Sequence, residues 1–204
     1  MKPDTFYYFH LLAAVSFSQG LAHSPILAGA DDSRQHPIMA SSDQPRMQQN
    51  NVMLSDVMGR DRSINLFASL TRDVASIEQR LEDSSQNSTV LAPLNSKIDA
   101  LPQKPWEDAR DYEAFGTAAA YEGDEGRDRA QKNLKKFGEA HVLPLSPWQE
   151  GEKVKSLLAG DKEIWWENKD GMKVIQPEGI EVDSVAGKVA NGEVWIIRGV
   201  RNYA

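Results

Sequence analysis

Histidine often supplies the catalytic base or metal ligand of a protein site, and this 204-residue sequence contains four histidines. Three of them lie within the first 36 residues, so they form no regular metal-ligating pattern with the fourth, His141. His141 follows Leu134 and Phe137 on one face of a predicted helix, where a buried imidazole would hydrogen-bond a backbone group. A catalytic base would also need a nucleophile, and the sequence has no Gly-x-Ser-x-Gly motif. We therefore expect that the protein is not an enzyme.

Composition argues against several other chemistries. The sequence has no cysteine, which excludes disulfides, thiolate metal sites and a thiol nucleophile. Its formal net charge is -7 and no basic stripe could neutralise phosphates, so we expect no nucleic-acid partner. The acidic, glycine-rich run at 122–126 lacks the ligand spacing of a calcium loop, and a solvated loop is expected there. No metal or cofactor is predicted.

Two features are typical of contact or modification sites. Asn87, Ser88 and Thr89 form a sequon for N-glycosylation, which an exported chain would use if the Asn87 side chain faces solvent. The alternative is an unused sequon in a tight turn. Trp165 and Trp166 are neighbours on a predicted strand, so one indole should point into the core. The other should face solvent, where a partner could contact it.

The elements that position these residues begin with helices. Apolar residues recur at spacings of three and four between residues 64 and 81, which predicts one helix with Ser63 as its cap. A short buried strand over 89–92 should end at Pro93, and Asn95 can cap a short helix through Leu101. The helix that carries His141 should end at Pro144.

The last third of the sequence has the pattern of strands. Two apolar runs, 163–167 and 172–175, flank an Asp170-Gly171 pair, which predicts a hairpin. A second hairpin is predicted around Asn191-Gly192, with strands on either side. Helices followed by antiparallel strands indicate the α+β class.

The first 51 residues have the pattern of an export signal and a disordered lead. Residues 1–22 combine an apolar run with small residues at cleavage-like positions, and cleavage as late as residue 30 is compatible with the sequence. A buried helix and an uncleaved anchor are the alternatives. Residues 31–51 have no apolar period, which predicts disorder. No second apolar stretch follows, so we expect no stable membrane span in the mature chain.

Three segments resemble the conserved boxes of fasciclin-like domains. They are the strand and Ala-Pro-x-Asn helix at 88–98, the helix end at 140–144, and the closing strand running into Gly-Val at 192–200. The resemblance implies one domain over 52–201, a β-wedge or sandwich with several helices packed at one end. It also implies structural roles for the box residues, which are Thr89, Pro93, Asn95, His141 and Gly199.

The sequence departs from the family pattern at two places. Ala140 occupies the position where the family often has tyrosine, so adhesion roles of a Tyr-His pair are not transferred. The stretch 105–129 is longer and more charged than the usual link, and we treat it as an insert. The arrangement is similar to small fungal members with a single domain.

These observations predict a non-catalytic binding or adhesion-type module of the secretory pathway. We expect it in the vacuole lumen, secreted, or at the cell surface, with a protein or a cell-wall or matrix glycan as partner. The alternative is a small-molecule hydrolase with an unrecognised site in the charged insert at 105–129.

Overall fold

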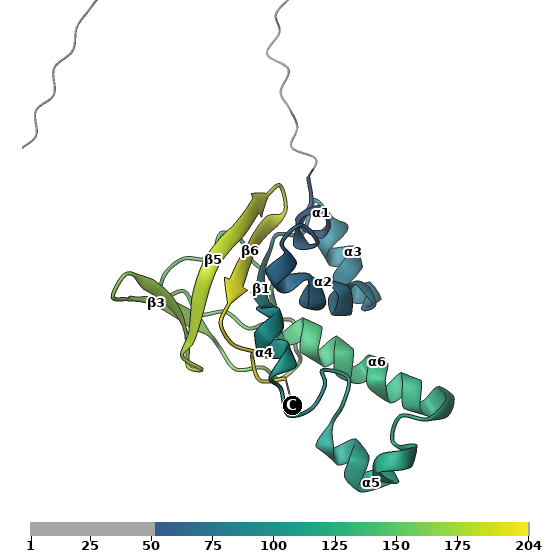
Figure 1. Ribbon diagram of the computed structural model, residues 1–204. Coiled ribbons are helices and arrows are strands. Elements are labelled where there is room, and N and C mark those ends of the chain that lie inside the picture. Colours follow the sequence, from purple (N-terminus) through teal and green to yellow (C-terminus); the bar gives the residue numbers. More distant parts are fainter. Residues whose placement is uncertain (1–51, 204) are drawn as a thin grey trace, which may run out of the picture. The chain divides into compact units, whose positions relative to one another are not determined.

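The computed structural model describes residues 52–203, so the predictions for residues 1–22 and 31–51 lie outside the described range. Helices predominate up to the end of α6, with β1 between α3 and α4, and the remaining strands follow (Figure 1). The helical elements are α1 (Leu54–Met58), the 3-10 turn η1 (Arg62–Ile64), α2 (Asn65–Arg72), α3 (Ala75–Glu82), α4 (Asn95–Asp99), α5 (Ala109–Ala119) and α6 (Gly123–Ala140). The strands are β1 (Ser88–Pro93), β2 (Val142–Leu143), β3 (Trp165–Lys169), β4 (Met172–Gln176), β5 (Ile180–Val189) and β6 (Gly192–Ile197).

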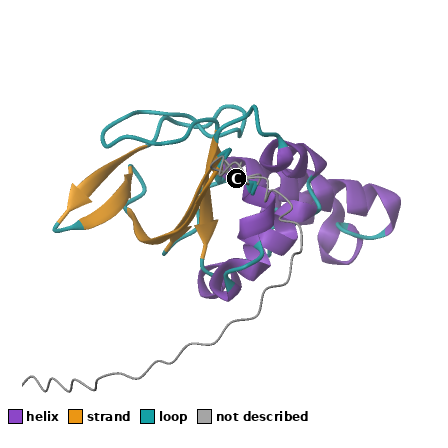
Figure 2. Cartoon of the chain, turned by 90° about the horizontal axis from the view of Figure 1, so that it is seen from above, coloured by secondary structure: helices purple, strands orange, loops and turns teal. Residues whose placement is uncertain are grey.

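The strands form one mixed sheet in the order β2-β1-β6-β5-β4-β3. β1 runs parallel to β6, and all other neighbouring strands are antiparallel. The sheet curls into a half-barrel, and the helices gather at one end of it, away from the β3–β4 hairpin (Figure 2). The α+β class predicted from the sequence is confirmed.

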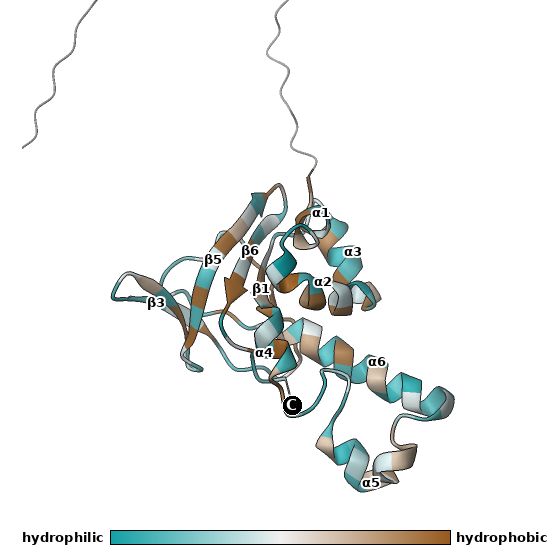
Figure 3. Cartoon of the chain, in the orientation of Figure 1, coloured by the Kyte–Doolittle hydropathy of each residue, from teal (hydrophilic) through white to brown (hydrophobic). Residues whose placement is uncertain are grey.

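Two apolar cores lie on the two faces of the central strands. Alternate residues of β6, whose C-terminal end is brown in Figure 3, point to opposite faces. Val194 and Ile196 pack with the helices in the helical core, whereas Trp195 and Ile197 pack in a second core. The loop between β2 and β3 closes this second core with Trp148. Each face of the sheet therefore buries its own apolar set.

The helix predicted over 64–81 is interrupted, and that prediction was wrong in two respects. The chain forms η1, α2 and α3, with a break at Asp73 and Val74 where neither residue continues the helix. Both residues have low helix propensity, and the apolar spacing stays in phase across the break. Ser63 is not the cap. Its backbone N–H instead donates to Asp61 Oδ1 at 2.8 Å, so Asp61 begins the first turn.

The acidic run at 122–126 is helical from Gly123 onward rather than a loop, and Glu122 precedes the helix as its N-cap residue. It forms the beginning of α6, whose first turn contains Asp124 and Glu125. Carboxylates at this position interact favourably with the helix dipole, which offsets the low propensity of the two glycines. These carboxylates remain exposed, as expected.

Both predicted hairpins are present. Asp170 and Gly171 connect β3 to β4 with φ values of 54° and 86°, the positive values that a two-residue hairpin turn needs. The β5–β6 turn lies one residue earlier than predicted, at Ala190 and Asn191, because Gly192 already pairs with Val189.

Candidate functional site

The two neighbouring tryptophans of β3 point to opposite faces of the sheet, as strand alternation predicts. Trp166 is buried in the second core, where its indole N–H donates to Trp148 O at 3.2 Å. Its ring also packs edge-on against Trp195, with 5.7 Å between ring centroids. Trp165 is only half-buried, and its indole N–H donates to Glu167 Oε1 at 2.7 Å. Trp166 is therefore a core residue, and Trp165 is the contact candidate.

The β3–β4 hairpin lies away from the helices (Figure 2), and Trp165 lies on the face of β3 opposite the buried Trp166. Glu167 and Lys169 share this face because side chains two apart lie on the same side of a strand. Met172 lies opposite Lys169 and is 46% exposed. We call Trp165, Glu167, Lys169 and Met172 the hairpin face. It is an amphipathic surface with a thioether and an indole among charged groups, and none of the four residues belongs to either core.

Lysine ammonium groups lie over tryptophan rings on both sides of this hairpin. Lys153 Nζ is 5.3 Å from the Trp165 ring centroid, and Lys173 Nζ is 3.2 Å from that of Trp166. Partial burial lowers the pKa of Lys173, with nearby carboxylates acting in the opposite direction. The cations cover indole surface that would otherwise meet water.

His141 is completely buried and caps α6, which ends at Ala140 rather than at Pro144 as predicted, because Val142 and Leu143 form β2. Its Nδ1 lies 2.7 Å from Phe137 O, and its Nε2 accepts the backbone N–H of Arg201 at 3.0 Å. This pair of contacts fixes the neutral tautomer with the proton on Nδ1. Burial, together with the nearby Arg201 cation, lowers the pKa of His141 to about 3. The backbone hydrogen bond expected from the sequence is present, and both ring nitrogens are occupied.

Arg201 is a buried cation that sequence reasoning missed. Its side chain is 1% exposed and donates to Ala140 O, to Asp161 Oδ2 at 2.9 Å and to Glu178 Oε2 at 3.1 Å. Burial would raise the pKa of Asp161, but hydrogen bonds from Arg201 and Ser156 hold it below its usual value. A single arginine after a strand has no periodic signature, so only the folded contacts identify it.

A groove of about 270 Å³ lies beside this charge network, with Asp161, Glu178 and Arg201 in its lining. His141 does not line it. The guanidinium is already saturated by one carbonyl and two carboxylates, so the groove holds no free catalytic pair among these groups.

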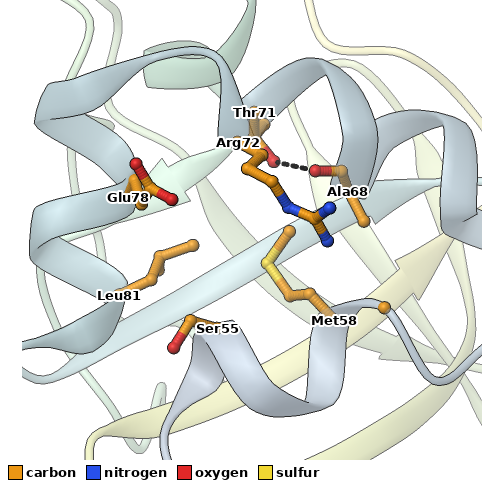
Figure 4. A pocket seen from close by; sticks show the side chains of 8 residues that line it. Ser55, Met58, Ala68, Thr71, Arg72, Glu78 and Leu81 are labelled. Carbon is orange, nitrogen blue, oxygen red and sulfur yellow. Dashed lines mark hydrogen bonds between the residues drawn. The ribbon is translucent and has the colours of Figure 1, made fainter.

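A smaller cavity lies between α1, α2 and α3 (Figure 4). It measures about 40 Å³, and Met58 and Leu81 line it together with Arg72 and Glu78. The hydroxyl of Thr71 at its wall donates back to the helix carbonyls of Phe67 and Ala68. This volume is on the scale of one water molecule, so the cavity is too small for an organic ligand.

The family-box residues contact segments that are distant from them in the sequence. Thr89 is fully buried, and its Oγ1 donates to Leu145 O at 2.8 Å. Pro93 ends β1, where it pairs with Ile197. Gly199 packs so closely that a Cβ there would approach Ile180 side-chain carbons at 3.2 Å.

Asn95 is a cap, but not of the helix that was predicted. Its Oδ1 accepts the backbone N–H of Leu66 at 3.0 Å, in the first turn of α2. Its amide nitrogen donates to Arg62 O and Asn65 Oδ1. Its own helix α4 has no side-chain cap and ends at Asp99, not at Leu101. Asn95 therefore connects α4 to α2.

The charged stretch 105–129 contains α5 and the beginning of α6, which project from the remaining helices in Figure 1. Asn133 of α6 donates to Trp106 O and to Asp111 Oδ2, and the Tyr121 hydroxyl donates to the same carboxylate at 2.9 Å. No residue of α5 is buried, and Phe115 is 48% exposed.

The polar side chains at the base of this stretch are engaged in hydrogen bonds and ion pairs within the fold. Hydrogen bonds from Arg110 lower the pKa of Asp108 to about 2, and burial raises the pKa of Tyr121 to about 12. Within residues 52–203, no group of three or more acidic or histidine side chains is arranged to hold a metal ion. None of the helices in that range is long and apolar enough to span a bilayer.

Comparison with known proteins identifies relatives in fungi. The chain is 62% identical over 153 residues to a FAS1 domain-containing protein of Neurospora crassa, covering 75% of this chain and 66% of the relative. It is 54% identical over 151 residues to a FAS1 domain-containing protein of Aspergillus fumigatus, covering 74% and 64%. The matched region therefore spans slightly less than two thirds of these relatives. No protein-family model matches.

A solved structure supports the same assignment. The FAS1 domain pair of the insect cell adhesion molecule Fasciclin I matches with a TM-score of 0.50 at 13% identity, covering 74% of this chain and 51% of that one. At this identity the likeness concerns the fold alone. Because the fungal relatives share more than half of the aligned residues and the fold agrees, this chain belongs to the FAS1 (fasciclin) domain family.

Proposed function

We propose that the protein is a non-catalytic binding module of the secretory pathway, associated with the cell surface, wall or vacuole. The observation that carries the proposal is Trp165, a half-buried indole on the hairpin face and outside both cores. Indoles are enriched at the energetic centres of protein contacts. Flanking carboxylate and ammonium groups on Glu167 and Lys169 suit polar contacts with a protein or a glycan.

A non-catalytic role is supported by the state of His141. Both of its ring nitrogens are engaged with backbone groups, and burial keeps the ring neutral. It is therefore poorly placed to accept a proton from a substrate near pH 7. In the charged stretch, Asp108 and Asp111 bind Arg110, Tyr121 and Asn133. No contact in that stretch favours the hydrolase alternative.

The binding proposal is tested by comparing two aromatic residues that lie outside both cores. The probe is washed, insoluble cell-wall material from Neurospora crassa, and the bound fraction is measured by sedimentation. Trp165→Ala should weaken binding by about tenfold or more, since truncating an aromatic hot spot typically costs at least 1–2 kcal/mol. Phe115→Ala removes a ring on α5 that is 48% exposed, more than the half-buried Trp165, and should bind like the parent. Equal binding by Trp165→Ala and the parent would exclude the hairpin face as the contact.

The secretory location is supported by the signal-like composition of residues 1–22. If that segment is removed, the mature protein should begin near His23 or Asp31. Amino-terminal sequencing of the protein from its own cells measures this directly. An intact Met1 on soluble cytosolic protein would contradict the proposal.

A further inference from the structure

The three residues of the Asn87 sequon have very different exposure in the folded protein. Asn87 is exposed at the turn that precedes β1. Ser88 and Thr89 are the first two residues of β1, and both are 0% exposed. The acceptor side chain is therefore accessible, whereas the hydroxyl that completes the sequon is not.

The buried hydroxyl is already bonded. Thr89 Oγ1 donates to Leu145 O at 2.8 Å, and Thr89 lies in the interior of the sheet, with β2 on one side and β6 on the other. The backbone N–H of Ser88 donates to Asn191 O at 2.9 Å. Reaching the Thr89 hydroxyl from outside would require the folded domain to open around β1, including the segment at Leu145 that accepts its hydrogen bond.

A second set of bonds holds the turn itself. Arg80 donates from Nε to Ser88 Oγ at 2.8 Å and from Nη2 to Asn87 O at 3.1 Å. Its Nη1 donates to Gln86 Oε1 at 2.6 Å. Asp83 accepts bonds from Ser85 and Gln86, and these bonds lower its pKa to about 2. Hydrogen bonds from α3 therefore hold the sequon in place, in addition to the hydrogen bonds of the sheet.

N-glycosylation requires the hydroxyl as well as the asparagine, because the acceptor sequence is Asn-x-Ser/Thr. The transferase forms a bond between Asn Nδ2 and the anomeric carbon of a glycan carried on a lipid pyrophosphate. The bond from that carbon to the pyrophosphate oxygen breaks, the lipid pyrophosphate leaves, and the amide nitrogen loses one proton. An enzyme that must engage both side chains cannot do so while Thr89 is buried in the folded domain.

We propose that Asn87 is a glycosylation site that folding closes: the glycan is added only before β1 joins the sheet. The inference rests on the proposed export of the chain, because only an exported chain meets the transferase. The attached glycan is compatible with the fold because the Asn87 side chain faces solvent. Occupancy of Asn87 is then set by competition between the transferase and formation of the sheet, and chains that fold first stay unmodified.

The test uses a purified oligosaccharyltransferase, a lipid-linked oligosaccharide donor and full-length unglycosylated protein. Folded parent is compared with Leu91→Pro, which keeps the sequon but removes the β1 N–H that donates to His141 O at 2.8 Å. A proline in an interior strand should prevent the sheet from forming. The folded parent should be modified at Asn87 at least roughly a hundredfold more slowly than Leu91→Pro, because modification must await opening of the sheet.

The matched control moves the sequon to an open position. Phe115→Asn in an Asn87→Gln background places a sequon at residues 115–117, all of which are exposed in the folded chain. Its modification rate should differ little between the folded form and the same chain with Leu91→Pro. Intact-protein mass measures how fast each sequon is modified. The quantity compared is the modification rate in the folded protein divided by the modification rate in the Leu91→Pro chain.

A ratio at Asn87 that is far below the ratio at residue 115 supports the proposal. Equal ratios overturn it, and so does absence of modification at Asn87 in Leu91→Pro. The reaction is carried out with isolated components, so its result does not depend on where the protein resides. Finding the protein in the cytosol would contradict the proposed function while leaving this result intact.

Discussion

His141 Nε2 accepts the backbone N–H of Arg201 at 3.0 Å, which joins two residues 60 positions apart in the sequence. The same imidazole lies 5.5 Å from the Phe67 ring centroid and 4.8 Å from that of Phe137. His141 therefore links the end of α6, the segment after β6 and the helical core. A neutral imidazole suits this place because it donates on one side and accepts on the other without a buried charge.

Replacing His141 by alanine should destabilise the protein. The change leaves a cavity beside two phenylalanine rings and an unpaired Arg201 N–H, and each effect costs on the order of 1–3 kcal/mol. Thermal unfolding followed by circular dichroism should shift down by several degrees, since about 1 kcal/mol corresponds to roughly 2–4 °C in a domain of this size. Wall binding at a temperature where the variant is folded should be unchanged. A variant that melts like the parent but loses binding would place His141 in the functional site instead.

Mild acid should also destabilise the protein through His141. The pKa of this imidazole is about 3 in the folded state against 6.5 in an unfolded chain, so below pH 6.5 the unfolded chain binds a proton that the folded chain does not. The free energy of unfolding should therefore fall by roughly 1.0–1.4 kcal/mol per pH unit between pH 6 and pH 5, above the ordinary pKa values of aspartate and glutamate near 4. Urea denaturation across this interval measures the slope. His141→Gln has no titrating group at this position and should show a much flatter profile, and equal slopes would contradict the pKa assignment.

Asn95 should stabilise α2 rather than its own helix. Asn95→Ala removes the acceptor for the Leu66 N–H, and loss of such a cap typically costs about 1 kcal/mol. Asn95→Asp keeps the acceptor but loses the two bonds that the amide nitrogen donates, so its loss of stability should be smaller. Hydrogen exchange should show faster exchange of Leu66 in the alanine variant, with the middle of α6 unaffected. Faster exchange confined to α4 would contradict the assignment.

The sequence predicted the features that depend on neighbouring residues. The Asp170-Gly171 turn needs only two residues that tolerate positive φ, and it forms where predicted. The opposite orientations of Trp165 and Trp166 follow from strand geometry alone. The sequence assigned the Asn95 cap to the wrong helix, and it did not identify Arg201. Both errors have the same cause. Their partners lie 23 to 61 residues away, and no local spacing encodes such pairs.

The helix break at Asp73 shows a different limit of sequence reasoning. Apolar periodicity reports which face is buried, and that face is the same before and after the break. Phe67 of α2 and Ile77 of α3 are both fully buried in the helical core. A continuous helix and two successive helices therefore have the same pattern over residues 64–81. The low helix propensities of Asp73 and Val74 were the only local sign.

Removing Arg201 alone should lower the free energy of unfolding more than removing Arg201 together with the charge of Asp161. Arg201→Met keeps much of the side-chain volume but leaves Asp161 without its main partner in a site where that carboxylate is 9% exposed. Breaking a buried ion pair on one side typically costs about 3–5 kcal/mol, because the remaining charge is not compensated. Adding Asp161→Asn to Arg201→Met removes that charge, so the double variant should recover part of the lost stability. Urea denaturation of the parent, both single variants and the double variant gives the coupling energy. Additive losses in the double variant would show that the two side chains stabilise the fold independently.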